Sequence, residues 1–323
     1  MPRKRATPQI DQPPADLILT SDWHLREDQP LAWEHSYWDA QQVSMTWLQD
    51  LQNHHGCPVV VAGDIFDKWK PSPWLLSWAL ENIPLPTYAI PGQHDLPQHS
   101  MSRIDESGIY TIKSGNGLSL LPIEPACTRL TPSKTPVYLY GYPFGTPATS
   151  LATRTRDGGC HIAAIHQLTY TRRKPYPGCT ADNATKLLTK MAGYDVVITG
   201  DNHQGFAIQG DDGRWLVNPG SWMRMTAGQI DYEPRIYLWY HKGNKVVPVN
   251  IPQVPGAVSR EHIDSETAQA ARDGRIDAYV ERLGDEIEIG LSFLNNLRAT
   301  VDKGKVRAPV QNLLWEAVDE HTD

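Results

Sequence analysis

The chain has 323 residues, 40% of them hydrophobic, so it can bury the core of one large α/β domain with an appendage, or of two average domains. Its mean hydropathy of -0.45 and the lack of an apolar run near about 20 residues argue against a membrane-spanning helix. The net charge of -7 excludes a protein that is basic over its whole surface, as many nucleic-acid-binding proteins are.

The N-terminal segment MPRKRATPQIDQPP is polar and rich in proline, which predicts a flexible basic arm over 1–14. No apolar stretch follows its basic start, as a secretory signal would require. The four cysteines lie at wide, irregular spacings without a CxxC pair, which is typical of reduced thiols. We therefore expect a cytoplasmic protein, located in the host cytoplasm if a phage encodes it.

The first third of the chain alternates between predicted strands and helices. Three short apolar runs that end in polar residues predict strands at 15–24, 57–67 and 86–95. Between them, near-helical spacing of large apolar residues predicts a helix over about 35–54, and a proline-containing start predicts another over 71–83. This strand–helix–strand order favours a sheet with parallel strands.

The middle of the chain is richer in residues that favour strands. Glycine, proline and β-branched residues over 109–146 predict short strands and hairpins. The further predicted elements are a strand at 160–168, a helix ending near Met191, a strand at 196–203, a hairpin over 205–221 with its turn at 211–213, and strands at 235–240 and 245–251.

The end of the chain differs in composition. From Ala257 onward there are eight Lys or Arg against fourteen Asp or Glu, so most of the negative charge lies there. After a proline-containing linker near 252–256, polar segments at about 265–283, 285–301 and 309–319 have the composition of helices. Such an acidic region is expected to meet protein, either its own domain or a partner, rather than DNA.

Five of the predicted strands end in polar side chains of the same kinds. Because ligands collect at the carboxyl ends of strands in open α/β sheets, we expect these side chains to lie together. Carboxylate, amide and imidazole donors suit manganese, iron or zinc, and there are enough of them for two ions. Each tip alone also fits a simpler structural role, such as a cap or a core histidine. The tips are Asp22-x-His24, Gly63-Asp64-x-x-Asp67, Gly92-Gln93-His94-Asp95, His166 and Gly200-Asp201-x-His203.

This order resembles the calcineurin-like metallophosphoesterases, whose signature runs DxH, GDxx(D/H), GN-H-(D/E), H, GHxH. The resemblance covers about 15–225 and ends at NPGS (218–221). Within it, GDIFDKWKPSPW and the later GQHD, both inside 63–95, are similar to the SbcD-type DNA-repair nucleases, including shorter SbcD-like exonucleases of phages and prophages.

The resemblance implies a four-layer α/β fold, in which a β-sandwich of two mixed sheets is flanked by helices and followed by a C-terminal helical cap or tail. The catalytic domain would span 15–254 and the acidic helical region 255–323. The resemblance also implies two divalent metal ions, with manganese favoured and magnesium as the other choice. Asp22, His24 and His203 would hold the first ion, Asp64 would bridge both, and Gln93, His166 and Asp201 would hold the second.

Two of these ligands depart from the family pattern. Gln93 stands where asparagine is usual, which keeps the amide oxygen but adds a methylene group. Asp201 stands where histidine is usual, and a carboxylate favours manganese or magnesium over softer ions. Both departures fall on the second ion, whereas the first-ion ligands and the bridge match the pattern.

The resemblance assigns catalysis to His94, which would stabilise the transition state or protonate the leaving group. Asp95 would fix the tautomer of His94 and raise its basicity. Asp67 would lie just outside the metal ligands. His99 is interpreted as an ordinary loop histidine.

The leading functional hypothesis is a metal-dependent DNA nuclease, acting as an exonuclease in DNA repair, recombination or phage DNA processing. Arg172, Arg173 and Lys174 are its candidate DNA contacts. The expected partners are DNA, an SMC-like ATPase subunit bound by the C-terminal helices, and a second copy in a homodimer, with no membrane. The alternatives are a phosphomonoesterase or small-nucleotide phosphodiesterase with the same metal site, and a scaffold whose metal site is vestigial.

Overall fold

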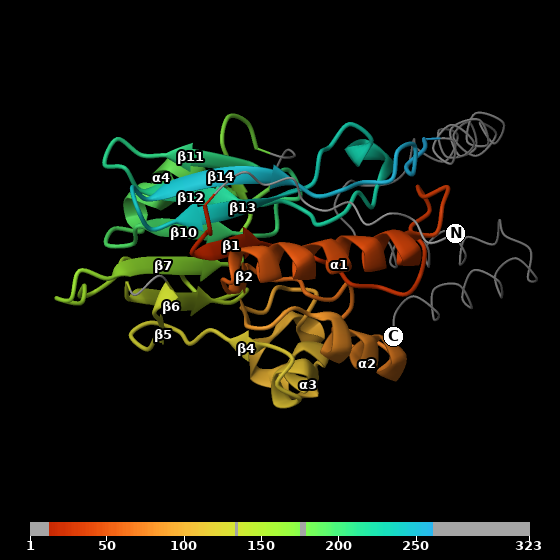
Figure 1. Ribbon diagram of the computed structural model, residues 1–323, viewed down its shortest axis with the longest axis horizontal. Coiled ribbons are helices and arrows are strands. Elements are labelled where there is room, and N and C mark those ends of the chain that lie inside the picture. The colour runs from red at the N-terminus through yellow and green to blue at the C-terminus, as the bar shows by residue number, and fades with distance from the viewer. Residues whose placement is uncertain (1–12, 133–134, 175–178, 261–323) are drawn as a thin grey trace, which may run out of the picture. The chain divides into compact units, whose positions relative to one another are not determined.

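The computed structural model describes residues 13–132, 135–174 and 179–260, and within them two six-stranded sheets carry the fold. The predicted arm over 1–14 and the predicted C-terminal helices therefore lie almost wholly outside the described residues. Figure 1 shows α1 running alongside the sheet that contains β1 and β2, and α4 beside the sheet that contains β11 and β12.

The first sheet has the strand order β14-β13-β1-β2-β3-β4. At its centre, β1 pairs in parallel with β2 and antiparallel with β13. β3 and β4 continue the parallel half of the sheet. Its strands are β1 (Leu17–Thr20), β2 (Val59–Val61), β3 (Thr87–Ala89), β4 (Ser119–Leu120), β13 (Arg235–Tyr240) and β14 (Lys245–Asn250).

The second sheet has the order β11-β12-β10-β7-β6-β5, and β10, β7 and β6 run parallel to one another. Two short parallel strands, β8 and β9, form a separate ribbon. The strands of these two sheets are β5 (Thr128–Leu130), β6 (Val137–Tyr142), β7 (Cys160–Ile165), β8 (Thr169–Tyr170), β9 (Asp182–Asn183), β10 (Val196–Thr199), β11 (Phe206–Gln209) and β12 (Trp215–Asn218).

Each longer helix begins where a side chain caps its first turn. The Ser36 hydroxyl accepts the N–H of Asp39 at the start of α1, and the left-handed Gly56 ends that helix. Ser72 caps α2 in the same way, with Pro73 at the first position as predicted. The helices are α1 (Tyr37–His55), α2 (Pro73–Asn82), α3 (Gly108–Ser114) and α4 (Ala184–Lys190), with short 3-10 turns η1 (Pro97–His99), η2 (Met101–Glu106) and η4 (Ala227–Gln229).

Both faces of the central strands are buried, which explains their continuous apolar sequences. Leu17 and Leu19 of β1 pack into the core between the two sheets, whereas Ile18 points the other way and packs with residues of α1 and α2. A third cluster, which includes Leu187 of α4, covers the outer face of the second sheet. Helices, sheet, sheet and helix thus form four layers, and the predicted fold class is confirmed.

One predicted segment was wrong. Residues 108–114 form α3, where short strands and hairpins were expected. The β-branched residues favour a strand locally, but Ile109 and Ile112 lie three positions apart and are both buried against the core. The Ser107 hydroxyl accepts the N–H of Tyr110 and caps the helix. Tertiary burial therefore outweighs local propensity here.

None of the four cysteines is joined in a disulfide. Within the described residues, no helix combines the length and apolar character needed to cross a lipid bilayer.

Candidate metal centre

The predicted ligands follow strands whose carboxyl ends point to one edge of each sheet. β1, β2 and β3 run parallel in the first sheet, and β7 and β10 run parallel in the second. Backbone hydrogen bonds continue beyond the strands: the N–H of Asp22 donates to the carbonyl of Gly63, and that of His24 to the carbonyl of Asp64. The loops that carry the first ligands are thereby fixed to one another.

Four of the predicted ligands have left-handed backbone conformations, with φ of 48° at Asp22, 45° at His24, 53° at Asp64 and 73° at Asp201. A non-glycine residue in this region costs about 1–3 kcal/mol and persists where its surroundings determine it. Such residues concentrate at functional sites because the strained turn aims a side chain. The four turns therefore mark this edge of the sheets as a candidate functional site.

Glycines let the His166 ring approach the backbone closely. A Cβ atom at Gly63 or at Gly200 would overlap the His166 imidazole. The ring is almost fully buried, and its Nδ1 donates to the carbonyl of Ala62 over 2.7 Å. The glycine before each of these motif carboxylates therefore makes room for a ligand that comes from another strand.

The first group of converging donors is Asp22, His24 and His203. The Nε2 atoms of His24 and His203 lie 3.2 Å apart. Two ligand atoms that each lie about 2.1 Å from one ion stand about 3.0–3.4 Å apart, so this spacing fits a shared cation. Asp22 Oδ2 is buried and accepts no hydrogen bond within the described part of the chain. A bound cation would satisfy that oxygen.

Asp64 lies between this group and His166. Its Oδ2 is 3.8 Å from His24 Nε2 and 3.3 Å from His166 Nε2. Its Oδ1 accepts the backbone N–H of His94 over 2.9 Å, which fixes the carboxylate plane. Oδ2 is buried, and the described residues give it no hydrogen bond of sound geometry. One oxygen is thus held by the backbone while the other faces both predicted ion positions.

Burial and charge perturb all of these groups. Burial raises the pKa of Asp22 and lowers that of His24 to about 3, so the His24 imidazole is neutral and can donate a lone pair. Burial alone would raise the pKa of Asp64, but attraction and hydrogen bonding to His166, together with His24 and His94, outweigh burial and the pKa is lowered. A divalent cation beside these carboxylates would favour their charged forms further.

The partners of His166 favour protons on both ring nitrogens while no ion is bound. Burial opposes its charge, yet Asp64 raises the pKa of His166 to about 10. Nδ1 faces the Ala62 carbonyl, while Nε2 faces Asp64 Oδ2 and, at 2.5 Å, Gln93 Oε1. All three are acceptors, so both nitrogens donate. The Nε2 proton stands where a ligand bond to a cation would form, and ion binding there would release it.

Gln93 and Asp201 are arranged differently from the other predicted ligands. Gln93 Nε2 donates to Asp201 Oδ1 over 2.7 Å, while its oxygen faces His166. The Asp201 backbone N–H donates to Asp22 Oδ1 over 3.0 Å. Among the predicted carboxylate and imidazole ligands, only Asp201 lies outside the groups of three converging donors found in the described residues.

His94 lies at the exposed mouth of the centre. Its ring meets that of His24 edge-on, with centroids 4.9 Å apart, and it forms a further donor group with His24 and Asp64. Its Nδ1 lies 2.9 Å from the backbone oxygen of Asp67 and donates to it. The other ring nitrogen, Nε2, is therefore the one left for chemistry.

The predicted contact between Asp95 and the His94 imidazole is wrong. The Asp95 carboxylate is fully buried and accepts the backbone N–H groups of Ile65, Phe66 and Gly92 over 3.0–3.1 Å. Burial is the main cause that raises its pKa to about 7, despite these three bonds. Asp95 thus fixes the loops that carry the ligands, and the carbonyl of Asp67 sets the His94 tautomer.

Asn218 is a supporting residue that the sequence analysis did not single out. It is fully buried at the end of β12. Its Nδ2 donates to the carbonyls of Asn202 and Gln204 over 2.7 and 3.0 Å, and its oxygen accepts from the Thr199 hydroxyl. It therefore holds the loop that presents His203. The NPGS motif was the signal, since it begins at the last residue of the buried strand β12.

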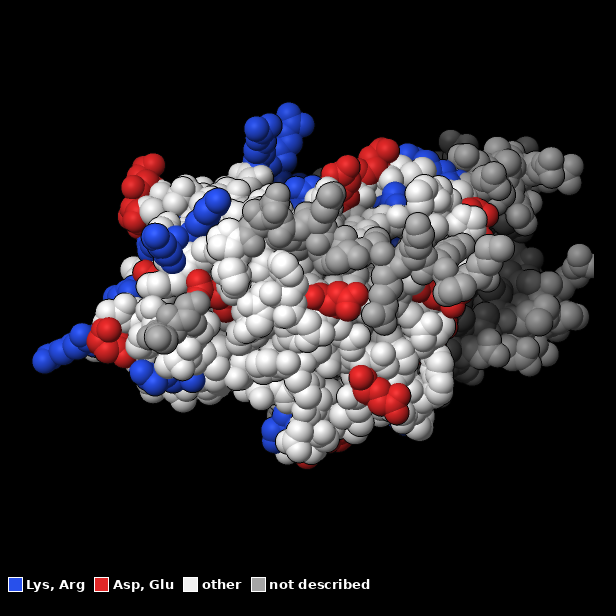
Figure 2. Space-filling view, in the orientation of Figure 1, with Lys and Arg blue, Asp and Glu red and all other residues white. Residues whose placement is uncertain are grey.

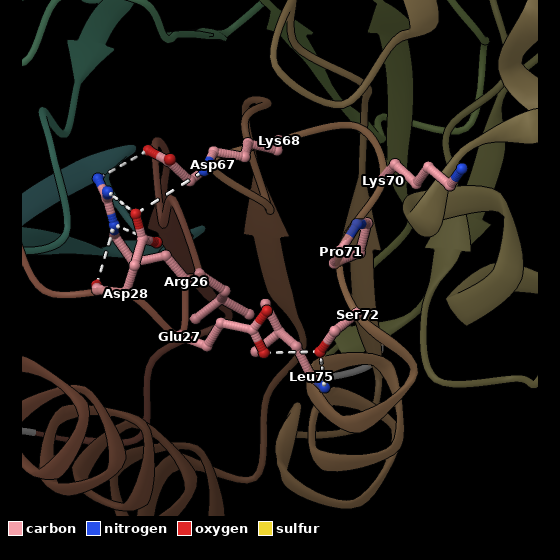
Figure 3. A pocket seen from close by; sticks show the side chains of 10 residues that line it. Arg26, Glu27, Asp28, Asp67, Lys68, Lys70, Pro71, Ser72 and Leu75 are labelled. Atoms are coloured by element: carbon pink, nitrogen blue, oxygen red, sulfur yellow. Dashed lines mark hydrogen bonds and ion pairs between the residues drawn. The ribbon is translucent and has the colours of Figure 1, made fainter.

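A shallow pocket opens between the loops that follow β1 and β2 (Figure 3). Arg26 points to two carboxylates, with ion pairs of 2.6 Å to Asp28 and 3.2 Å to Asp67. Lys68 and Lys70 also line the pocket, and Figure 3 shows Lys70 directed away from the other charged groups. Asp67 belongs to both sites, because its carbonyl contacts His94.

The predicted DNA contacts Arg172, Arg173 and Lys174 are exposed and follow β8. Lys174 Nζ donates to the carbonyl of Cys179 over 2.9 Å. On the face shown in Figure 2, Lys and Arg side chains are scattered among Asp and Glu and form no continuous basic surface over the described residues. These contacts remain predictions.

The four-layer sandwich and its aspartate–histidine cluster at the strand ends define a metal-dependent phosphoesterase. The sequence model for calcineurin-like phosphoesterases matches residues 16–205, more than half of the chain, and the protein belongs to this family. No curated protein matches it. Among solved structures it is similar to the crystal structure of TT1561 of Thermus thermophilus, at 13% identity and a TM-score of 0.44, over 74% of this chain and 99% of that chain.

Proposed function

We propose that the protein is a two-metal-dependent phosphodiesterase that acts on DNA as a nuclease, and specifically as an exonuclease in DNA repair, recombination or phage DNA processing. The observation that carries the proposal is the convergence of buried, unsatisfied donors on one centre. Asp22 Oδ2 and Asp64 Oδ2 lie among His24, His203 and His166, which is costly unless cations compensate.

The donor set fits divalent ions of intermediate hardness. Carboxylate oxygens with imidazoles suit manganese, and magnesium is the second choice. Asp22, His24 and His203 would hold one ion, and Asp64 would face both. Such ions, when bound, activate a water molecule and neutralise the phosphoryl oxygens.

The protein's own groups orient the reaction. The backbone N–H of His94 holds Asp64 Oδ1, so the free oxygen keeps a fixed direction. His94 donates Nδ1–H to the carbonyl of Asp67, so its Nε2 can carry a proton to the leaving oxygen at the open side of the centre. Asp95 keeps these loops in place through three backbone hydrogen bonds.

Three features support DNA as the substrate. The stretch 63–95 is similar to SbcD-type nucleases. The pocket beside His94 offers Lys68 and Lys70 to a neighbouring phosphate. The exposed run of Arg172, Arg173 and Lys174 follows β8, within ten residues of the predicted ligand His166 along the chain. Contacts of this kind make binding strongly dependent on salt.

A phosphomonoesterase or small-nucleotide phosphodiesterase is the second candidate. Lys68 and Lys70 in the pocket could contact the phosphate of a small ester. The scattered charges in Figure 2 also fit a small substrate better than a long polyanion on that face.

One assay separates the two candidates. The full-length protein is incubated with end-labelled single- and double-stranded DNA, and separately with a mononucleotide, in manganese or magnesium. The proposal predicts progressive shortening of the DNA with manganese. Intact DNA together with rapid hydrolysis of the mononucleotide would favour the second candidate.

Partners beyond DNA are also proposed. The acidic region over 255–323, which is largely outside the described residues, is proposed to bind an SMC-like ATPase subunit, and the chain is proposed to form a homodimer. Light scattering of the full-length protein, alone and mixed with such an ATPase, tests both. A monomer that never shifts in mass on mixing would reject them.

A further inference from the structure

The two predicted ligands that depart from the family pattern are hydrogen-bonded to each other. Gln93 Nε2 donates to Asp201 Oδ1 over 2.7 Å, although 108 residues separate them in the chain. Given the ligand assignment of the proposed function, we infer that this pair acts as one unit, which gives the protein one tightly bound ion and one exchangeable ion.

The first-ion ligands are ready to bind. Asp22 Oδ2 is buried and accepts no hydrogen bond within the described residues, so a cation there displaces no existing partner. The Nε2 atoms of His24 and His203 share one long hydrogen bond of 3.2 Å, which a cation would replace at nearly the same spacing of the two nitrogens. Binding at this position needs little rearrangement, and a preorganised site binds tightly.

The second-ion ligands are already engaged with one another. The Gln93 amide is bound at both ends, with its oxygen 2.5 Å from His166 Nε2 and its nitrogen on Asp201. An asparagine would end one carbon–carbon bond earlier, about 1.5 Å, and could not span the two in the same way. Coordination through the Gln93 oxygen must break its contact with His166, and coordination through Asp201 Oδ1 competes with the Gln93 donor, so both weaken that ion's binding.

Asp201 also supports the first ion through its backbone. Its N–H donates to Asp22 Oδ1 over 3.0 Å, which leaves Oδ2 of that carboxylate for the cation. Its side chain turns instead to Gln93. Asp201 therefore strengthens the first position, while one of its two carboxylate oxygens is already engaged at the second. The supply of free metal would then regulate activity, because the exchangeable ion completes the centre.

The test is a manganese titration of the full-length, chelator-stripped protein. Calorimetry gives the two dissociation constants, and electron paramagnetic resonance detects the spin coupling of a completed ion pair. We expect the second ion to bind about 10–100-fold more weakly than the first, as for a centre whose supporting contacts oppose it. The coupled signal should appear only when the weaker position fills.

Variants then test the pairing. The double variant Gln93→Asn/Asp201→His should bring the two constants within about threefold of each other, while each single change should restore far less than half of that effect. Gln98→Asn shortens an exposed glutamine in the same loop and should leave both constants unchanged. Circular dichroism confirms that each variant is folded.

Equal affinities in the unaltered protein would overturn the inference, and so would single changes whose effects sum to that of the double variant. The comparison of the two affinities in the unaltered protein does not depend on whether any variant folds. The titration also uses no DNA. Unequal binding without DNA cleavage would therefore reject only the proposed nuclease function, whereas DNA cleavage with equal binding would reject only this inference.

Discussion

The metal centre has two halves, the ligands of the first ion and those of the second. Both sets follow the ends of strands, but their polar groups differ in the hydrogen bonds that they form. Asp22, His24 and His203 converge with a buried oxygen that accepts no hydrogen bond within the described residues. Gln93 and Asp201 are joined by a hydrogen bond of 2.7 Å to a carboxylate, whereas the contact between the His24 and His203 imidazoles is longer, at 3.2 Å. A buried oxygen without a hydrogen bond gains a partner when a cation binds, whereas ligands already bonded to each other gain less. The two ion positions are therefore expected to differ in metal affinity.

Asp64 joins the two halves, so its replacement should have the largest effect. Asp64→Asn keeps an oxygen for the His94 N–H but removes the negative charge between His24 and His166. Metal ions contribute several kcal/mol to the transition state, and the loss should lower kcat on a bis-aryl phosphodiester on the order of 10³-fold. The melting temperature should change little.

The matched control for this prediction is Asp105→Asn, which makes the same change at an exposed position. It should leave turnover unchanged. If Asp64→Asn kept more than about a tenth of the turnover with normal metal content, Asp64 would not be the shared ligand.

His94→Ala should have the next largest effect, because it removes a proton carrier but no essential metal ligand. We expect kcat to fall about 10²–10⁴-fold while both manganese constants stay within about threefold. Steady-state kinetics measures kcat, and calorimetry measures the manganese dissociation constants. His99→Ala alters another exposed histidine five residues away and serves as the control. Full activity in His94→Ala would contradict the assigned role.

Asn218→Ala should weaken the first half of the centre without removing a ligand. The loop that presents His203 loses its hydrogen bonds to the Asn202 and Gln204 carbonyls. We expect the tighter manganese constant to weaken about 10–100-fold, with activity recovered by excess manganese. A loss of activity that excess manganese does not restore would mean that Asn218 acts on folding instead.

Lys68→Ala with Lys70→Ala should have the smallest effect and should separate the pocket from the metal centre. DNA binding should weaken severalfold, and the slope of log affinity against log salt should fall by about one per lysine. Hydrolysis of a bis-aryl phosphodiester should not change. Lys113→Ala, at an exposed position on α3, is the control. An unchanged slope of log affinity against log salt would show that Lys68 and Lys70 do not contact DNA.

The strand tips were predictable from the sequence because each combines two local signals. An apolar run predicts a buried strand, and the polar residues directly after it mark the edge where parallel strands end. Asp22, Asp64 and His166 could be placed this way without coordinates. The hairpin over 205–221 was equally local, and β11 and β12 pair as expected.

Other features depend on contacts between distant residues. The helix at 108–114 forms because Ile109 and Ile112 reach a core that local propensity does not reveal. Asp95 follows His94 in sequence, yet its carboxylate turns inward to the backbone. The Gln93–Asp201 bond joins two loops whose separation only the fold determines.

Anomalous diffraction from crystals of the protein grown in excess manganese locates the ions themselves. We expect two peaks about 3.5–4 Å apart, one against Asp22, His24 and His203 and the other against His166, with Asp64 touching both. Peaks elsewhere, or none among these side chains, would contradict this ligand assignment.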